Sequence, residues 1–213
     1  GDKRQFALGA ADIVVTEAGV GSVMGAEKFM HIKAANSGKS PDCVVMNVTV
    51  RSMKLHGGAF GERGGYRPTP EELATENVEA VVVGATGNLD RHIRNMAGFG
   101  MPVVVSINRF STDTDAELAA LSDAARASGA TDVTICEVHA KGGAGGEQLA
   151  KAVVSAVHDH IAAGRPFTPL FMPDASVREK IDSIATRIYK ADRVVIEASA
   201  AKQLALIEAW GYG

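Results

Sequence analysis

The 213-residue sequence predicts an α/β fold, with a mostly parallel sheet and helices on both faces. One reason is that short apolar runs alternate with longer amphipathic segments, as strands and crossover helices do in such proteins. A second is that most of the apolar runs are rich in valine, which is typical of strands covered on both faces. With 46% hydrophobic and 22% charged residues, the chain has the composition of a globular protein with a sizeable core.

The strands and helices can be assigned in order along the chain. Strands are expected at residues 12–16, 43–50, 102–107, 133–137 and 193–196. Helices are expected at residues 25–35, at 71–98 with a break near 86–88, and at 115–128, 146–163, 176–189 and 200–210. The most ambiguous segment is 79–87, because its three consecutive valines favour a strand whereas its flanks favour a helix. We predict a helix there.

Two segments rich in glycine or proline interrupt this pattern. Residues 57–73 predict a long ordered loop or lid before the third strand. Residues 165–174 contain three prolines and are expected to carry the chain to a peripheral segment. We therefore expect a core portion at residues 1–164 and a peripheral α/β segment at 165–213, which begins a further domain.

Charge and cysteine usage exclude several classes of protein. The net charge is −3 and Lys and Arg are scattered, so we expect no nucleic-acid partner. Cys43 and Cys136 lie in or beside apolar runs, where buried thiols are more common than a disulfide. No signal peptide or bilayer-length apolar run is seen, so we expect a cytoplasmic protein without a membrane partner.

In an open parallel sheet, ligands bind where loops leave the carboxyl ends of strands. The first such loop, EAGVGSVMGAEKF, contains Gly19, Gly21 and Gly25. The dinucleotide fingerprint G-x-G-x-x-G is not matched, because Met24 holds its third glycine position. The glycines could instead bind an anion at a helix N-terminus, or only allow close packing.

The second loop, TVRSMKLHGG, carries three basic side chains. A turn soon after Val50 would gather Arg51, Lys54 and His56 at the sheet edge. There they could hold a carboxylate or phosphate, with the adjacent glycines permitting close backbone approach. A solvated basic rim is the alternative.

The third and fourth loops add an amide, two cations and more glycine. Asn108 and Arg109 follow a buried strand, and Asn108 could read a purine base by hydrogen bonds. Thr112 or Asp113 is expected to cap the next helix.

The fourth loop, EVHAKGGAGG, is no Walker A motif because Lys141 precedes the glycines, and G-x-x-x-x-G-K-[ST] occurs nowhere in the sequence. The remaining histidines form no metal-spaced set with carboxylates or cysteines, so we expect no metal site.

Taken together, these segments resemble the formate–tetrahydrofolate ligase family. VTEAGVGSVMGAEKF, NVTVRSMKLHGG, PVVVSINRFSTDTDAEL, EVHAKGGAGG and IATRIYKADRVVIEASAAKQLALIE match it in order and spacing, and the resemblance covers essentially the whole chain. It implies a fold related to P-loop NTPases. It also implies an ATP-dependent ligase that joins formate to tetrahydrofolate through formyl phosphate and gives 10-formyltetrahydrofolate.

The resemblance further implies ATP with Mg²⁺, tetrahydrofolate as substrate, a monovalent cation, and a homo-oligomer of the full-length protein. Family members are much longer, and their amino-terminal portion carries the phosphate-binding loop. This chain therefore resembles an internal piece or one subunit of a split enzyme, which we expect to be incomplete and inactive alone.

We expect the strand-end loops to form one wall of a cleft for ATP and folate. The expected nucleotide-binding residues are Asn108, Arg109, Lys141, Gly142 and Gly143. The expected folate or substrate residues are Glu17, Gly19, Gly21, Met30, Arg51, Lys54, His56, Ser111 and His139. No catalytic residue is assigned, because phosphoryl transfer depends mainly on positioning and charge stabilisation.

Several expected pocket residues depart from the family pattern. Met30 replaces a common aromatic, Ser111 a proline and His139 a tryptophan, while residues 20 and 22–24 of the first loop also differ. A good aromatic contact contributes on the order of 1 kcal/mol beyond burial, so the absence of several should weaken or redirect folate binding. Three hypotheses remain open: a ligase with a divergent pocket, a paralogue with another acid or acceptor, and a non-catalytic subunit.

Overall fold

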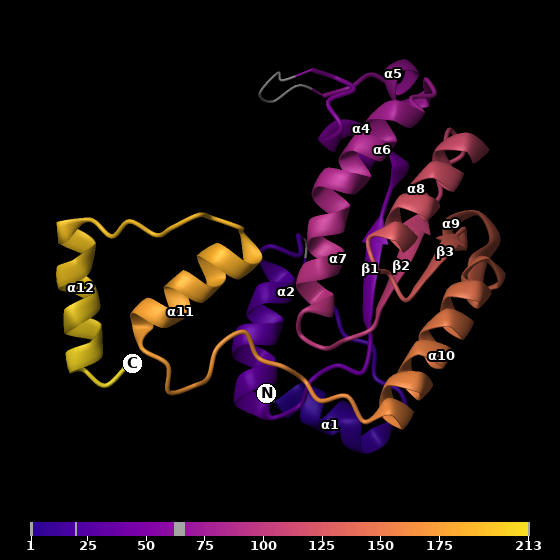
Figure 1. The fold of residues 1–213 in the computed structure, drawn as a ribbon. Helices are drawn as coiled ribbons and strands as arrows, with labels where there is room; N and C mark the ends of the chain where they lie inside the picture. Colours follow the sequence, from indigo (N-terminus) through magenta and orange to yellow (C-terminus); the bar gives the residue numbers. More distant parts are fainter. Residues whose placement is uncertain (1, 20, 62–66, 213) are drawn as a thin grey trace. The chain divides into compact units, whose positions relative to one another are not determined.

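The computed structural model describes residues 2–19, 21–61 and 67–212 of the chain (Figure 1). They fall into two compact units. The first, here called the sheet unit, is Pro41–Phe167, and the second, here called the helical unit, combines Gly1–Ser40 with Thr168–Gly213.

The sheet unit contains a parallel sheet of three strands among its described residues. The strands are β1 Val44–Val48, β2 Val103–Asn108 and β3 Asp132–Cys136, in the order β1-β2-β3. Val48 is in register with Ile107, and Asn108 with Cys136, so all three strands end at one edge. The predicted α/β class is confirmed, and these three strands lie close to their expected limits.

Helices cover both faces of this sheet. They are α4 Val50–His56, α5 Pro70–Ala74, α6 Val78–Gly84, η2 Ala85–Leu89, α7 Asp90–Ala97, α8 Asp115–Ala127, α9 Val138–Lys141, η3 Gly142–Gly146 and α10 Glu147–Ala163. Val104 packs against Ala152 and Ala156 of α10. Since successive strand residues face opposite sides, Val103 and Val105 point the other way, and they are buried as well. Central strand β2 is thus doubly covered, as its valines predict.

Strand β1 ends two residues earlier than expected because Thr49 begins a helix. Its hydroxyl accepts a hydrogen bond from Ser52 N (3.0 Å), and Ser52 Oγ accepts one from Thr49 N (3.3 Å). This reciprocal capping box satisfies two free N–H groups at the start of α4. Val50, expected in the strand, is instead the first residue of α4 and is fully buried.

The strands expected at residues 12–16 and 193–196 are not formed. Both segments lack regular secondary structure and join no ladder among the described residues. Their valines and isoleucines favour an extended backbone, but a strand also needs a neighbour for its N–H and C=O groups. Strand propensity is a property of the segment itself, whereas pairing needs a second segment beside it, which the propensity does not predict.

The helical stretch expected at 71–98 is present, with its interruption elsewhere. Residues 79–87 are helical as predicted, in α6 and the π-helical η2. The break expected near 86–88 is therefore wrong, because η2 continues directly into α7. The chain leaves the helix between α5 and α6 instead, where Asn77 Oδ1 accepts from Ala80 N (2.9 Å) and starts α6. Of the loop expected at 57–73, residues 62–66 lie outside the described residues.

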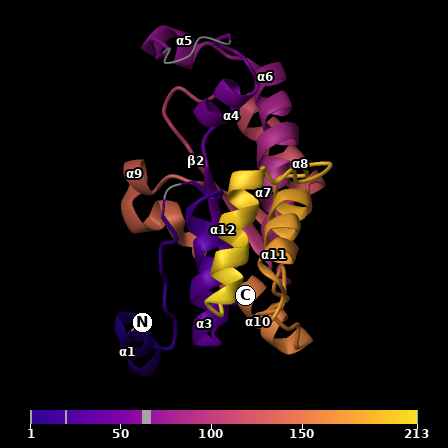
Figure 2. The same ribbon diagram turned by 90° about the vertical axis from the view of Figure 1, so that its left-hand side faces the viewer.

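Helices α4 and α6 touch through glycine, and both views show them side by side (Figure 1, Figure 2). A Cβ on Gly57 would lie 1.8 Å from the carbonyl oxygen of Ala80, and one on Gly84 would lie 2.1 Å from that of Met53. No side chain fits at such distances. Glycine at these two positions is therefore what allows the backbones of the two segments to come so close.

The helical unit joins the two ends of the described chain. Its elements are α1 Asp2–Ala10, α2 Gly25–Lys28, η1 Phe29–Ala34, α3 Ala35–Ser37, α11 Val177–Ser183, η4 Ile184–Ile188 and α12 Ala198–Ala209. Phe29, Leu170 and Ile188 are buried. The Tyr189 hydroxyl donates to Glu27 Oε1 (2.8 Å), which ties the later segment to the earlier one.

Candidate functional site

The candidate site is the edge of the sheet where all three strands end. Directly after β1, β2 and β3 come Thr49, Arg109 and Glu137. Arg109 N donates to Cys136 O (3.1 Å), so the backbone ladder between β2 and β3 extends one residue past the strands. The first residues of the loops after β2 and β3 are therefore held together by a backbone hydrogen bond. Ligands bind at this edge in open parallel sheets.

Arg51 projects from the first turn of α4 onto the loop after β2. Its guanidinium carbon lies 3.9 Å from the centre of the Phe110 ring, and Nη2 donates to Thr112 Oγ1 (3.2 Å). A cation over an aromatic face is attracted by the ring quadrupole. Helix α4, which follows β1, thus contacts the loop after β2 through Arg51, and the side chains of Arg51 and Phe110 are both half-buried.

The loop after β2 is held by a tight turn. Phe110 N donates to Asp113 Oδ2 (2.8 Å), and Asp113 N donates back to Phe110 O (3.0 Å). Burial raises the pKa of Asp113, although the Phe110 N–H and the positive charge of Arg51 oppose this. The expected helix cap at Thr112 or Asp113 is wrong, because Thr114 Oγ1 accepts from Glu117 N (3.3 Å) and caps α8.

The loop after β3 places an acidic group between two cations. Glu137 pairs with Lys141 Nζ, and Arg109 Nη1 lies 3.9 Å from its other oxygen. The Lys141 hydrogen bond is the main reason that the pKa of Glu137 is lowered. Arg109 Nη2 also pairs with Asp115 Oδ1 (3.1 Å). Two residues expected to bind the nucleotide are thus joined through Glu137, and an anionic ligand would have to compete with it.

The glycines of EVHAKGGAGG serve the loop itself at two positions. Gly142 has φ 59° and ψ −147°, a backbone region that is essentially open to glycine alone. A Cβ on Gly145 would lie 2.4 Å from Glu137 O, and Glu137 N donates to Gly145 O (3.0 Å). Gly143 is different, because a Cβ there would meet no described atom within 4 Å and its φ is not positive.

Lys54 does not join Arg51 and His56 at the surface as expected. It is 1% exposed, and its ammonium lies 2.7 Å from Glu117 Oε1. His56, two residues on, is exposed. The sequence could not separate these basic residues because it predicted a turn after Val50, whereas helix α4 turns Lys54 inward.

The remaining expected residues lie in different places. Asn108 is half-buried at the end of β2, and Ser111 and His139 are exposed on the loops after β2 and β3. The four expected in the first loop region belong to the helical unit: Glu17, Gly19, Gly21 and Met30. The first three are exposed, with φ 95° at Gly19 and 77° at Gly21. Position 20 lies outside the described residues.

Met30 is buried and therefore has no surface on which a ring could stack. It is 4% exposed within η1 of the helical unit. The expectation that Met30 replaces an aromatic in the pocket is not supported by this burial. Sequence inspection also missed Phe110, Glu117 and Glu137 as site-forming residues, although Phe110 is adjacent to Arg109 and Glu137 lies four residues before Lys141.

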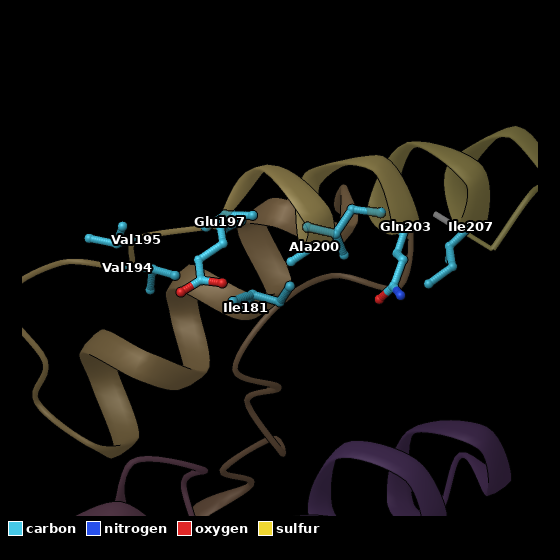
Figure 3. Close-up of a pocket in the computed structure, with 9 residues that line it drawn as sticks. Ile181, Val194, Val195, Glu197, Ala200, Gln203 and Ile207 are labelled. Atoms are coloured by element: carbon cyan, nitrogen blue, oxygen red, sulfur yellow. The ribbon is translucent and has the colours of Figure 1, made fainter.

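A groove in the helical unit is a poorer candidate for charged substrates. Its lining comes mainly from apolar side chains, including Ile181, Val194 and Ile207, with Glu197 and Gln203 as polar members (Figure 3). No lysine, arginine or histidine is among the described residues that line it. A groove of this kind offers no positive charge to an anionic ligand.

Two general features of the described residues also bear on function. Within residues 2–19, 21–61 and 67–212, no helix has the length and apolarity needed to cross a membrane. The same ranges contain no group of three or more His, Cys, Asp or Glu side chains that could hold a metal ion.

The parallel sheet, with arginine, lysine and glycine in the loops at its carboxyl edge, defines an open-sheet α/β protein of the class that binds ligands at strand ends. A family model for formate–tetrahydrofolate ligase matches residues 3–213. The chain belongs to the formate–tetrahydrofolate ligase family.

Curated relatives agree with this family assignment. The formate–tetrahydrofolate ligase of Desulforamulus reducens is 44% identical over 209 residues, which cover 98% of this chain and 36% of the relative. That of Roseiflexus castenholzii is 46% identical over 206 residues, covering 97% and 36%. That of Allorhizobium ampelinum is 44% identical over 207 residues, covering 97% and 35%. The chain thus spans about a third of the length of these relatives.

Proposed function

We propose that this chain forms one wall of the substrate cleft of an ATP-dependent formate–tetrahydrofolate ligase. Family membership supports this proposal, and the observation that carries it is that three cations, Arg51, Arg109 and Lys141, lie in the segments that directly follow the carboxyl ends of the three strands. Formate, formyl phosphate and ATP are anions, so cations at such an edge have a direct use. The cytoplasm and a homo-oligomer of the full-length protein are part of the same proposal.

The reaction would proceed in two steps. A formate oxygen attacks the terminal phosphorus of ATP and breaks its bond to the oxygen of ADP, which leaves formyl phosphate. The N10 amine of tetrahydrofolate then attacks the formyl carbon, phosphate departs, and the amine loses a proton to give 10-formyltetrahydrofolate. Neither step needs a covalent bond to the protein, so the side chains act by positioning and by charge stabilisation.

The nucleotide side of the cleft is assigned to the loops after β2 and β3. Asn108 is proposed to recognise the base, and Lys141 to pair with an anionic group of the ligand. Arg109, Gly142 and Gly143 would complete this side. Because Lys141 already pairs with Glu137, ligand binding would exchange one anionic partner for another rather than fill an uncompensated site.

The folate side is assigned first to Arg51, His56, Ser111 and His139 of the sheet unit. Glu17, Gly19 and Gly21 of the helical unit stay proposed substrate residues as well. We do not propose direct contacts for Lys54 and Met30, because both side chains are buried. ATP would arrive with Mg²⁺, and a monovalent cation would assist. We assign neither ion a set of ligands among the described residues.

A second candidate is a paralogue that serves another acceptor. Two observations favour it: Ser111 and His139 are exposed at the carboxyl edge, yet neither offers the ring of the proline or tryptophan usual in similar enzymes. An imidazole is a smaller stacking surface than an indole. A different acid or acceptor could therefore use the same phosphate chemistry.

The test is tetrahydrofolate binding and turnover by the full-length protein. The ligase proposal expects formate- and tetrahydrofolate-dependent release of phosphate from ATP, and saturable tetrahydrofolate binding. His139→Trp should tighten tetrahydrofolate binding about fivefold to tenfold, since one good aromatic contact contributes on the order of 1 kcal/mol. ATP binding with no detectable tetrahydrofolate binding at millimolar ligand would favour the paralogue.

A further inference from the structure

A fully buried ion pair joins helices α4 and α8, which follow strands β1 and β2. Lys54 Nζ is 2.7 Å from Glu117 Oε1, and the two side chains are 1% and 0% exposed. Neither can touch a ligand directly. Buried charges of this kind are rare unless they are paired and hydrogen-bonded.

Every donor of the lysine ammonium has a partner. Besides Glu117, Nζ donates to the carbonyl oxygens of Thr75 (2.9 Å) and Leu73 (3.1 Å). Three partners match the three N–H groups of an ammonium. The lysine therefore joins α4 to the backbone at the end of α5.

The carboxylate of Glu117 is satisfied as well. Oε1 also accepts from Asn77 N (2.7 Å), and Oε2 accepts from Thr114 N (3.2 Å). Burial by itself would raise the pKa of Glu117, but the hydrogen bonds from Lys54, Asn77 and Thr114 outweigh it and lower the pKa. Glu117 thus connects the start of α6 with the start of α8.

This network anchors both partners of the Arg51–Phe110 contact. Arg51 lies three residues before Lys54, so the two project from neighbouring turns of α4. Phe110 belongs to the turn that runs directly into the Thr114 cap and Glu117. A shift at either end of the ion pair would therefore move one side of that contact relative to the other.

We propose that Lys54 and Glu117 are positioning residues, whose buried ion pair holds α4 and the loop after β2 together so that Arg51 and Phe110 form a preassembled wall of the ligand cleft. The importance of that wall for catalysis rests on the proposed function. The positioning itself does not, because it is a statement about the Arg51–Phe110 contact.

The kinetic test uses the full-length protein with Lys54→Met and Glu117→Gln combined. These near-isosteric changes remove both charges together, so no unpaired buried charge remains. We expect a folded protein whose kcat/KM for tetrahydrofolate falls about tenfold to a hundredfold, because ångström-scale misplacement has effects of that order. The matched control, Lys151→Met with Glu147→Gln, removes an exposed pair on α10 and should leave kcat/KM within about twofold.

A double-mutant cycle with Arg51→Ala distinguishes positioning through Arg51 from a purely structural role of the ion pair. If the buried pair acts through Arg51, removing the pair in the Arg51→Ala background should lower kcat/KM less than about twofold further. If the ion-pair variant lowers kcat/KM by the same factor with and without Arg51→Ala, the proposal is overturned. If the doubly substituted protein does not fold, Lys54→Gln with Glu117→Gln takes its place, because two amides can hydrogen-bond to each other and no buried charge is left unpaired.

A crystal structure of the doubly substituted protein separates failure of positioning from failure of the proposed function. The Arg51 guanidinium should leave the Phe110 ring, whether or not the wild type proves to be a ligase. A guanidinium that stays about 3.9 Å from the ring centre, as in the wild type, would overturn the positioning role. A displaced guanidinium in the variant, together with a wild type that has no ligase activity, would overturn only the proposed function.

Discussion

At the scale of single residues, burial changes the acid–base behaviour of Asp113. The residue is 6% exposed, and Oδ1 is buried without a hydrogen-bond partner among the described residues. Burial is the largest influence and raises its pKa, and the nearby Glu117 carboxylate acts in the same direction. Hydrogen bonding from Phe110 N and the charges of Arg51 and Lys54 oppose the rise without cancelling it.

Asp113→Asn should become relatively more stabilising as pH rises. A folded pKa above the ordinary 3.8 means that the wild type loses stability between about pH 4 and the folded pKa, because ionisation is harder in the folded state. Asparagine does not titrate, and its amide oxygen can still accept from Phe110 N. Urea unfolding at several pH values from about 3.5 to about 7.5 should show the free energy of unfolding of the variant rising relative to that of the wild type. A constant difference would contradict the shift.

Cys43 should react slowly with thiol reagents in the folded protein. Burial raises the pKa of its thiol to about 11, so at pH 8 only about one molecule in a thousand carries the reactive thiolate. Mass spectrometry after timed alkylation should show a Cys43 rate that rises about tenfold per pH unit from 8 to 10. Modification in denaturant provides the control, and equal rates in folded and unfolded protein would refute burial.

At the scale of elements, the packing of α4 against α6 depends on two glycines. The backbone of each helix comes within side-chain distance of the other, at Gly57 and at Gly84. Because α4 carries both Arg51 and Lys54, this packing helps to fix the positions of the two basic residues. A glycine that the sequence offered as an aid to ligand approach, Gly57, is used for helix packing.

Gly84→Ala should destabilise the protein by about 1–3 kcal/mol, as overpacking does. The added Cβ would lie 2.1 Å from Met53 O, and backbone atoms at this distance must move. Gly87→Ala is the matched control in the adjoining η2, since no described atom lies within 4 Å of its Cβ. That change should be neutral or stabilise by up to about 1 kcal/mol. Urea midpoints of the two variants provide the comparison, and equal effects would contradict the close approach of the helices.

At the scale of the whole molecule, the expected site residues are shared between two units. All of them except Lys54 and Met30 are exposed or half-buried. The sheet unit holds the larger group, including both arginines and Lys141. The chain also spans only about a third of the length of its relatives, which are 36% covered.

The 213-residue chain alone should not complete the ligase reaction. Its sequence has no G-x-x-x-x-G-K-[ST] motif, whose backbone N–H groups and lysine hold nucleotide phosphates in related folds. Purified chain with formate, ATP, Mg²⁺ and tetrahydrofolate should give no 10-formyltetrahydrofolate above the enzyme-free rate, measured by product absorbance after acid conversion. A full-length relative supplies the positive control, and turnover by the 213 residues would refute this expectation.

Much of the fold was predictable because it depends on local patterns. The valine run of β2 predicted a doubly covered strand, and the polar residues before α8 predicted a capped helix near its true start. Pairing was not predictable in the same way. Residues 12–16 and 193–196 have strand-like composition, yet they join no ladder in the described chain.

The sequence by itself determined the family, the parallel α/β sheet and the carboxyl edge as the place to look, because strand composition and strand-end motifs are properties of contiguous residues. Only the tertiary structure decided which basic residues face that edge. Arg51 and Lys54 are three positions apart in one short helix, but the first stacks on Phe110 and the second is buried against Glu117. The partners lie 59 and 63 positions away in the sequence, and which residues meet across such separations is set by packing alone.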